Sequence, residues 1–184
     1  MKFMRWYSIF AFPLKVFFMI CTFIVKSGKK GRILLQRAKF KIPSNVGIGE
    51  ITIIGNNFSV GENSYYNSGY ISTNKNAGVK IGKWCAIGHN VTLLAVTHDT
   101  GIPTGAENLR PLKTGDVIIE DGVWIGSNVI ITPGVRIGKQ SVIGGNSVVT
   151  KNVPEYTVCS GNPCKILYTK NEAEIIKHSD IIQS

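Results

Sequence analysis

One histidine in this chain stands where proton transfer would be useful. His98 lies in Thr97-His98-Asp99, where a regular apolar pattern in residues 91–96 stops and a polar segment begins. Imidazole has an unperturbed pKa of about 6.5, and a positioned base of this kind accelerates a reaction by ~10²- to 10⁴-fold. The adjacent Asp99 is a candidate to orient or charge the ring. A lone loop histidine is as often incidental as catalytic, so these residues alone leave both interpretations open.

The other histidines and the cysteines form no pattern typical of a metal site. His89 follows Ile87-Gly88 at an outward position and is expected to be solvated, and so is His178. Cys85 falls two positions before Ile87, so we expect it to be a small core residue. The cysteines show neither paired ligand spacing nor a disulfide framework, and they fit a reducing compartment; they are Cys21, Cys85, Cys159 and Cys164.

A period of six residues governs the segment 117–149. Large aliphatic residues recur at that spacing without a slip: Ile119, Ile125, Ile131, Ile137, Ile143 and Val149. Neither a helix nor a simple alternating strand has this period, whereas a parallel β-helix does. The pattern therefore predicts an all-β fold, a single-stranded left-handed parallel β-helix with the aliphatic residues inside. The glycine that follows many of them is expected at a corner where φ is difficult for other residues.

The same repeat occurs upstream with two interruptions. Ile42, Ile48, Ile54 and Val60 share one register, and Ile81, Ile87 and Leu93 share another. The break between these registers predicts a bulge or small insertion in residues 63–78. A longer break predicts a projecting loop in residues 97–116, which are polar and rich in Gly and Pro. Long loops on a rigid scaffold are usually functional.

The positive charge is concentrated at the N-terminus. Residues 1–49 contain no Asp or Glu, so they carry the whole net charge of +10, and the rest of the chain is formally neutral. This terminal location argues against nucleic acid as the partner. The apolar run 8–25 is marginal for a span of about 20 residues and contains Pro13 and Lys15. It suits a helix lying on an anionic cytoplasmic leaflet, or alternatively one that covers the open end of the β-helix or packs between subunits.

These features divide the chain into three parts. Residues 1–40 are expected to form a basic, hydrophobic, membrane-associated helical segment. Residues 41–168 are expected to form the β-helix, with its loop at 97–116. Residues 169–184 are expected to form a short amphipathic helical tail.

The motifs of the second half resemble one enzyme family. They are Thr97-His98-Asp99 and the segments 118–129, 133–138, 142–154 and 160–167. In this order they resemble the hexapeptide-repeat acyltransferases, which include galactoside, maltose, xenobiotic and capsular-polysaccharide O-acetyltransferases. The coils upstream of the loop match only by period. The resemblance implies a left-handed β-helix, acetyl-CoA as acyl donor, no metal, and a homotrimer with each site between neighbouring subunits.

The resemblance also implies roles for single residues at the reacting centre. His98 matches the catalytic base of the family, and Trp124 matches the aromatic residue that lines the tunnel for the pantetheine arm. Ser127 and Gly145 match positions that touch the acyl thioester and pantetheine. Gly145 stands where the family often has Ala.

Further positions match the two ends of the substrate site. Thr150, Lys151 and Lys165 match positions near the nucleotide end of coenzyme A. Lys165 replaces a frequent Arg, which keeps the charge but loses the bidentate fork. Asn67 matches an acceptor-binding Asn.

The predicted function is transfer of an acetyl group from acetyl-CoA to a sugar hydroxyl of a cell-envelope polysaccharide or its precursor. The enzyme would be cytoplasmic and peripheral on the inner face of the membrane. The first alternative is a xenobiotic acetyltransferase that modifies antibiotics. Less favoured are a metal enzyme like the γ-carbonic anhydrases, which needs three converging histidines, and a non-catalytic β-helix scaffold.

Overall fold

The computed structural model describes residues 16, 19, 27–99 and 111–171. The chain divides into two units, Met1–Lys39 and Phe40–Ser184. In the first unit residues 27–39 are helical, and no helix among the described residues is long and apolar enough to cross a bilayer. Most of the predicted membrane segment 8–25 and the predicted helical tail from residue 172 onward lie outside the described residues.

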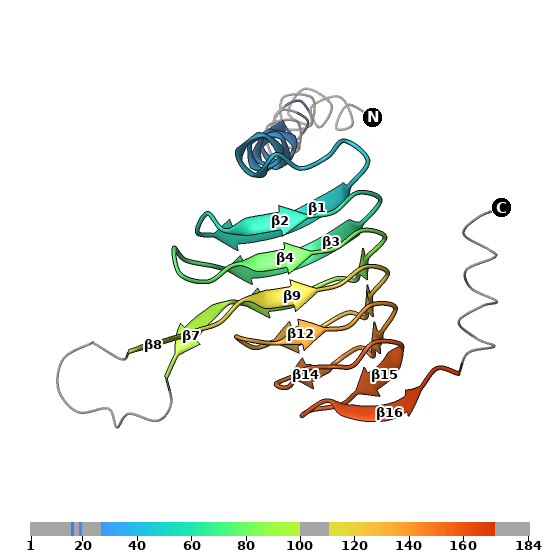
Figure 1. Cartoon of the computed structure of the whole chain (residues 1–184). Helices are drawn as coiled ribbons and strands as arrows, with labels where there is room; N and C mark the ends of the chain where they lie inside the picture. The colour runs from blue at the N-terminus through green and yellow to red at the C-terminus, as the bar shows by residue number, and fades with distance from the viewer. Residues whose placement is uncertain (1–15, 17–18, 20–26, 100–110, 172–184) are drawn as a thin grey trace, which may run out of the picture. The chain divides into compact units, whose positions relative to one another are not determined.

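The second unit is a left-handed parallel β-helix with three flat faces (Figure 1). The first face holds β1 (Gly47–Ile54), β3 (Tyr65–Ser72), β5 (Ala86–Ile87), β10 (Trp124–Ile125), β13 (Val142–Ile143) and β15 (Thr157–Ser160). Strands β1 and β3 continue onto the second face, which adds β6 (Val91–Leu94), β11 (Ile130–Ile131) and β14 (Val148–Val149). The third face holds β2 (Phe58–Val60), β4 (Val79–Ile81), β9 (Val117–Ile119) and β12 (Arg136–Ile137).

The predicted repeat forms the core of this prism. The six aliphatic residues of the period are each at most 1% exposed: Ile119, Ile125, Ile131, Ile137, Ile143 and Val149. Each ends a short strand, so the residue before it points outward, as alternation in a strand requires. Cys85 is buried as predicted. The β-helix predicted from the period is therefore confirmed.

The explanation given for the glycines was wrong at most corners. Gly126 follows Ile125 but is not among the described residues with positive φ, whereas Asn128, two positions later, has φ 58°. A Cβ on Gly126 would lie 2.6 Å from the backbone N of Gly145 in the next coil. Gly126 is therefore needed for close approach of two coils, and Asn128 supplies the left-handed turn.

The first interruption, predicted in residues 63–78, is shorter than expected, because residues 65–72 form β3. It is a turn in residues 73–78, where the Asn74 side-chain oxygen accepts hydrogen bonds from the backbone N of Asn76 and of Ala77, both at 2.8 Å. The second is an arm that leaves the prism (Figure 1). Its stem is the antiparallel pair β7 (Val96–His98) and β8 (Leu112–Thr114). Residues 100–110 of the arm lie outside the described residues.

The C-terminal end of the prism folds back on itself. Strand β16 (Lys165–Thr169) pairs antiparallel with β15 after a turn that contains a cis peptide bond between Asn162 and Pro163. Cys159 and Cys164 flank this turn with their sulfur atoms at bonding distance and their Cα atoms 6.0 Å apart. This corrects the expectation of no disulfide, because the antiparallel turn brings together two cysteines whose sequence spacing gave no such signal.

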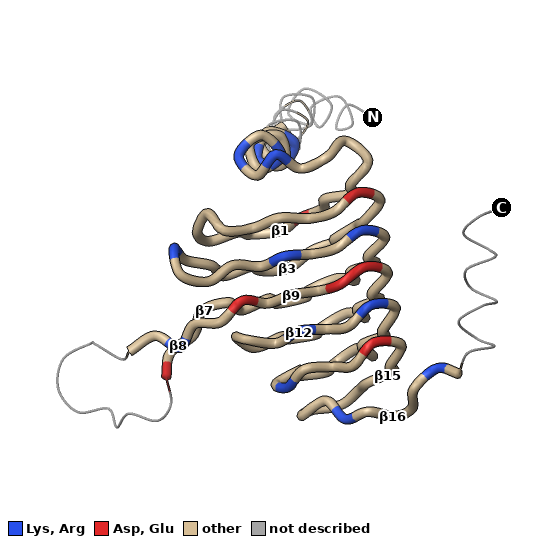
Figure 2. The backbone as a smooth tube through the Cα atoms, in the orientation of Figure 1, with Lys and Arg blue, Asp and Glu red and all other residues tan. Residues whose placement is uncertain are grey.

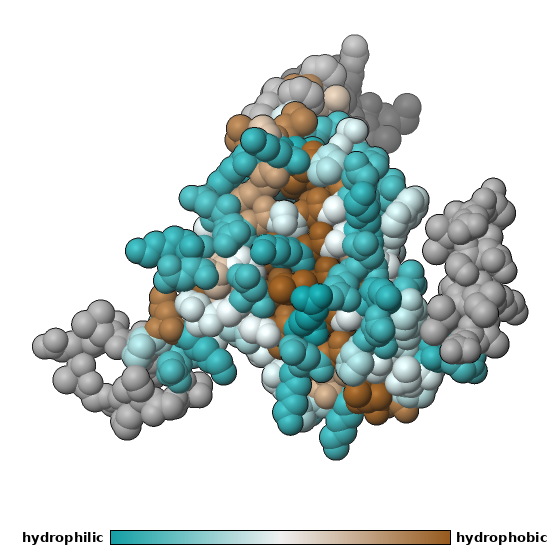
Figure 3. All heavy atoms as spheres, in the orientation of Figure 1, coloured by the Kyte–Doolittle hydropathy of each residue, from teal (hydrophilic) through white to brown (hydrophobic). Residues whose placement is uncertain are grey.

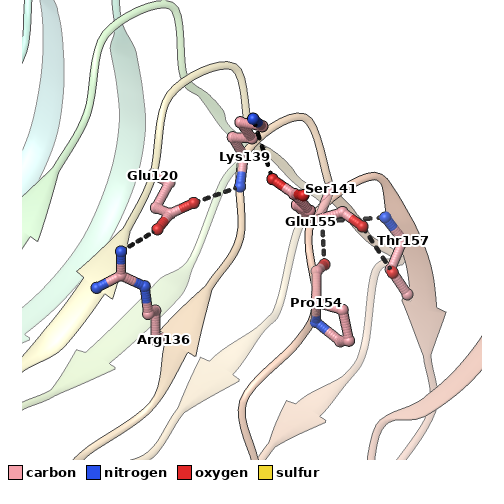
Figure 4. A network of polar contacts seen from close by, with 7 residues as sticks. All are labelled: Glu120, Arg136, Lys139, Ser141, Pro154, Glu155 and Thr157. Carbon is pink, nitrogen blue, oxygen red and sulfur yellow. Dashed lines mark hydrogen bonds and ion pairs between the residues drawn. The ribbon is translucent and has the colours of Figure 1, made fainter. Parts of the chain in front are cut away.

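Charged residues of alternating sign follow the corner between the third and first faces (Figure 2). Lys139 is central, because its ammonium lies 3.1 Å from Glu155 and its backbone N donates to Glu120 at 2.7 Å (Figure 4). Glu120 also pairs with Arg136. Exposed ion pairs each contribute little stability, so the network serves mainly to align successive coils. Hydrophilic side chains gather along both edges of the third face, with a narrow apolar stripe between them (Figure 3).

Candidate functional site

The corner between the first and second faces stacks three equivalent turns, which we call the 1/2 corner. In each turn the sequence is Ile-Gly-x-Asn, and x is His89, Ser127 or Gly145. The backbone N of His89 donates to the Ser127 hydroxyl oxygen at 3.1 Å. One coil on, the backbone N of Asn146 donates to the carbonyl oxygen of Ser127 at 2.9 Å. Ser127 is thus fixed from both neighbouring coils while its side chain stays exposed.

An asparagine ladder holds this corner together. The Asn90 amide donates to the Asn128 side-chain oxygen at 3.0 Å, and the Asn128 amide donates to the Asn146 side-chain oxygen at 3.1 Å. The three residues have φ of 53°, 58° and 58°. Asn tolerates this left-handed conformation better than most residues do. The ladder therefore sets the spacing of the turns that carry His89 and Ser127.

Trp124 stands on the first face, next to the 1/2 corner. Its side chain is 56% exposed, and it lies in register with Ala86 in one neighbouring strand and Val142 in the other. The outward-facing residues in register with Trp124 on neighbouring strands are apolar: Ala86, Val142 and Val158. The indole therefore stands among apolar side chains. Beside it is a groove of ≈ 480 Å³ lined by Gly122, Trp124, Gln140, Val142, Val158, Tyr168 and Lys170.

Lys165 lies at the C-terminal end of the same corner. It begins β16 and pairs with Ser160, the last residue of β15. Ser160 lies against the turn of Gly144 and Gly145, because a Cβ on Gly144 would come 2.5 Å from the Ser160 hydroxyl oxygen. The order Ser127, Gly145, Lys165 therefore runs down one side of the prism.

The remaining predicted residues divide between two corners. Asn67 lies on β3 at the 1/2 corner. Thr150 and Lys151 are exposed at the turn that follows β14, between the second and third faces. His98 is exposed on the arm that leaves the prism after β6, also between the second and third faces. Asp99 continues the arm, and its backbone N donates to the carbonyl oxygen of Pro111 at 2.8 Å.

The structure thus brings together one half of the predicted site and separates it from the other. Asn67, Trp124, Ser127, Gly145 and Lys165 share the 1/2 corner and the adjoining first face. Within one chain, His98, Thr150 and Lys151 belong to a different corner. The six-residue repeat alone could not assign these residues to one corner or the other, because each of the three corners carries equivalent positions of the repeat.

The buried thiol is unsuited to nucleophilic chemistry. Burial is the main cause that raises the pKa of Cys85, and the thiol donates to the carbonyl oxygen of Glu120 at 3.0 Å. It therefore stays protonated near neutral pH. In the part of the chain that the structure describes, no three His, Cys, Asp or Glu side chains are grouped so that they could hold a metal ion.

His89 is a member of the 1/2 corner that sequence reasoning assigned only to a solvated face. Its backbone N contacts Ser127, and its ring lies near Ser68, one coil earlier. The shared Ile-Gly-x-Asn pattern of residues 87–90 and 125–128 was the available signal, because equal positions in two coils stack.

Comparisons with known proteins agree with this architecture. Residues 116–151 match the family model "Bacterial transferase hexapeptide (six repeats)". A solved maltose O-acetyltransferase from Clostridium difficile 630 superposes with a TM-score of 0.61 at 31% identity, over 78% of this chain and 76% of that one. The chain belongs to the hexapeptide-repeat acyltransferase family. The resemblance predicted from the motifs is therefore confirmed.

Two further relatives of this hexapeptide-repeat acyltransferase are galactoside acetyltransferases. The Escherichia coli (strain K12) galactoside O-acetyltransferase is 39% identical over 125 residues, which are 65% of this chain and 58% of that protein. A galactoside acetyltransferase solved in complex with coenzyme A superposes with a TM-score of 0.57 at 28% identity, over 79% of this chain and 82% of that one. The chain spans about half the length of the curated relatives that it matches first.

Proposed function

We propose that this hexapeptide-repeat acyltransferase moves an acetyl group from acetyl-CoA to a sugar hydroxyl of a cell-envelope polysaccharide or its precursor. The observation that carries the proposal is the continuous track Ser127, Gly145 and Lys165 along the 1/2 corner, with the exposed indole of Trp124 beside it. A solved relative binds coenzyme A, which supports the same ligand on this track.

The track offers the groups that a thioester donor requires. The Ser127 hydroxyl oxygen accepts a hydrogen bond from the backbone N of His89, so its own proton is free for the thioester carbonyl oxygen. A preorganised donor at that point stabilises the developing oxyanion. Gly145 leaves room beside Ser127 for the pantetheine arm, and Lys165 meets a phosphate of the nucleotide. Thr150 and Lys151 are proposed as further contacts of the nucleotide end.

The proposed chemistry is direct transfer within a ternary complex. His98 takes the proton from the sugar hydroxyl while that oxygen attacks the thioester carbonyl carbon. The tetrahedral intermediate then collapses, the C–S bond breaks, and coenzyme A leaves as its thiol after it receives the proton. Cys85 is buried and protonated, which supports a mechanism without an acyl-enzyme. Asp99 is proposed to support the imidazole.

A homotrimer would complete this site. Ser127 and His98 lie at different corners of one chain, whereas the reaction needs both groups on the same substrate. A neighbouring copy can place its arm, with His98, against the 1/2 corner of the first copy. We therefore propose three equivalent sites between subunits, with Asn67 among the acceptor contacts.

The N-terminal unit is proposed to bind an anionic membrane surface on the cytoplasmic side. Leu34 and Leu35 are 66% and 73% exposed on the helix that includes residues 27–39, and residues 1–49 contain no acidic residue. Exposed apolar side chains among basic ones are typical of helices that lie in a lipid interface. In flotation assays the full chain should bind vesicles that contain phosphatidylglycerol, and Leu34→Ser with Leu35→Ser should weaken binding. Equal binding by the double variant would contradict a role for this helix.

A turnover assay tests the enzymatic proposal. Thiol release from acetyl-CoA is followed with methyl β-D-galactopyranoside and with envelope polysaccharide stripped of esters by mild base. His98→Ala should lower turnover by ~10²- to 10⁴-fold, the usual contribution of a positioned base. In calorimetry the His98→Ala variant should bind coenzyme A with an affinity close to that of the wild-type protein. His178→Ala serves as the matched histidine control, and wild-type turnover by His98→Ala would refute the base assignment.

A further inference from the structure

The imidazole of His89 contacts a hydroxyl of the coil before it. Its Nδ1 atom lies 3.4 Å from the Ser68 hydroxyl oxygen, which accepts a hydrogen bond from the backbone N of Asn90 at 3.0 Å. The Ser68 oxygen is therefore already an acceptor, and its single proton is available for Nδ1. Nδ1 accepts this proton in the tautomer that carries the ring hydrogen on Nε2. His89 thus presents an N–H donor from an exposed corner.

The position of His89 on the 1/2 corner shows on which side of Ser127 this donor lies. Ser127 lies one coil further on, and the spacing between neighbouring strands is about 4.8 Å. Gly145 and Lys165 continue away from His89 on the far side of Ser127, as described above. With the acyl group at Ser127 and the nucleotide toward Lys165, His89 lies on the opposite side, beside Asn67 and Ser68.

The ring of His89 takes no part in the contact between its own coil and the coil of Ser127. It is exposed, and the coil-to-coil contact with Ser127 is made by the backbone N of His89 and not by the ring. The ladder at this corner is made by the following residue, Asn90. Replacement of the imidazole should therefore leave the fold and Ser127 in place.

We propose that His89 binds the sugar acceptor, donating a hydrogen bond from Nε2 to an oxygen next to the hydroxyl that is acetylated. This inference rests on the proposed function, because it needs the acyl group at Ser127. It assigns the acceptor a footprint over His89 and Asn67, on the side of Ser127 away from Lys165. His98 remains the base, supplied from another corner.

Steady-state kinetics of the full chain test the proposal. The acceptors are methyl β-D-galactopyranoside and ester-stripped envelope polysaccharide, at saturating acetyl-CoA. His89→Ala should raise KM for the acceptor by about three- to tenfold, the factor for one neutral hydrogen bond. The KM for acetyl-CoA and kcat should stay within about twofold. His89→Gln should recover much of the loss, because its amide can donate from a similar distance. Lys75→Ala, an exposed change in the 73–78 turn, is the control.

The ring proton offers a second readout that does not depend on turnover. In spectra of ¹⁵N-labelled histidine, His89 should show the Nε2–H tautomer, and Ser68→Ala should shift the Nδ1 signal, because the hydrogen bond to Nδ1 is lost. Addition of the acceptor with coenzyme A present should shift the Nε2 signal.

The outcomes separate the two proposals. If no saccharide is acetylated by the wild-type protein, the proposed function fails and the acceptor role fails with it. If the wild type is active but His89→Ala keeps the same acceptor KM, only the role of His89 is refuted. A fall in kcat with unchanged KM would also refute it and would indicate proton transfer by His89 instead. A dominant Nδ1–H tautomer would contradict donation from Nε2.

Discussion

Replacement of Asn128 by Ala should weaken the corner that carries the proposed site. Asn128 is the middle member of the ladder, and it makes one side-chain hydrogen bond to Asn90 and one to Asn146. It also has φ 58°. Alanine would remove both bonds and hold a Cβ in a left-handed turn without local compensation.

The cost follows from these two losses. Two exposed hydrogen bonds contribute roughly 1–2 kcal/mol together, and a left-handed conformation costs an ordinary L-residue roughly 1–2 kcal/mol. The Asn128→Ala variant should therefore lose about 2–4 kcal/mol of unfolding free energy. For a chain of this size that corresponds to a fall in Tm of roughly 4–15 °C. Asn128→Asp is the matched control, because it tolerates positive φ and keeps the acceptor, and should lose only about 1 kcal/mol.

Thermal and urea unfolding measure this difference at one fixed protein concentration, since assembly shifts apparent stability. The expected order of stability is wild type, then Asn128→Asp, then Asn128→Ala. An Ala variant within about 0.5 kcal/mol of the wild type would refute the reasoning, because neither the ladder nor the positive φ would then matter. Equal losses in Ala and Asp would assign the effect to the bond with Asn146 alone.

Three further predictions concern the donor site and the core. Lys165→Ala should raise the KM for acetyl-CoA with little change in kcat, because it removes a proposed phosphate contact; an unchanged KM in the thiol-release assay would exclude Lys165 from the site. Gly126→Ala should destabilise by roughly 1–3 kcal/mol in urea unfolding, because its Cβ would meet the backbone N of Gly145 at 2.6 Å, whereas equal stability would show that the coils can separate. The raised pKa of Cys85 means that the unfolded thiol ionises first, so this contribution to stability is present below the unfolded pKa of about 8.5 and is lost as pH rises above it. Between pH 7 and 10 the free energy of unfolding should therefore fall less steeply with pH for Cys85→Ala than for the wild type. An equal pH dependence of the two proteins would contradict the buried, protonated thiol.

The period of six was sufficient to predict the fold because it reports a local geometry. Ile125 and its equivalents in residues 117–149 are buried, since a short strand followed by a tight corner returns the same position to the interior. The two insertions were located for the same reason: they shift the register of residues that must face inward. The upstream register was partly wrong, because Ile54 is 51% exposed. Gly126 was interpreted incorrectly, because its constraint comes from Gly145 in the next coil and not from its own backbone conformation.

The candidate site was only partly predictable. The motifs pointed to His98, Trp124, Ser127 and Lys165 without indicating which corner each would occupy. The structure places Trp124 and Ser127 together and His98 elsewhere. The residue type of His89 alone did not predict a place in the site, because its role depends on contacts with Ser68 and Ser127, which belong to two different coils.

The sequence by itself determined that this chain winds into a β-helix, which residues of the segment 117–149 fill it, and where the arm leaves it. Those properties follow from the alternation of inward and outward residues along a single strand, so they can be read locally. The tertiary structure decided which side chains meet across coils: the asparagine ladder, the contact of Gly126 with Gly145, and the column His89–Ser127. Contacts between coils join residues that are distant in the chain, and insertions change their offset. Only the folded register shows which side chains share a corner.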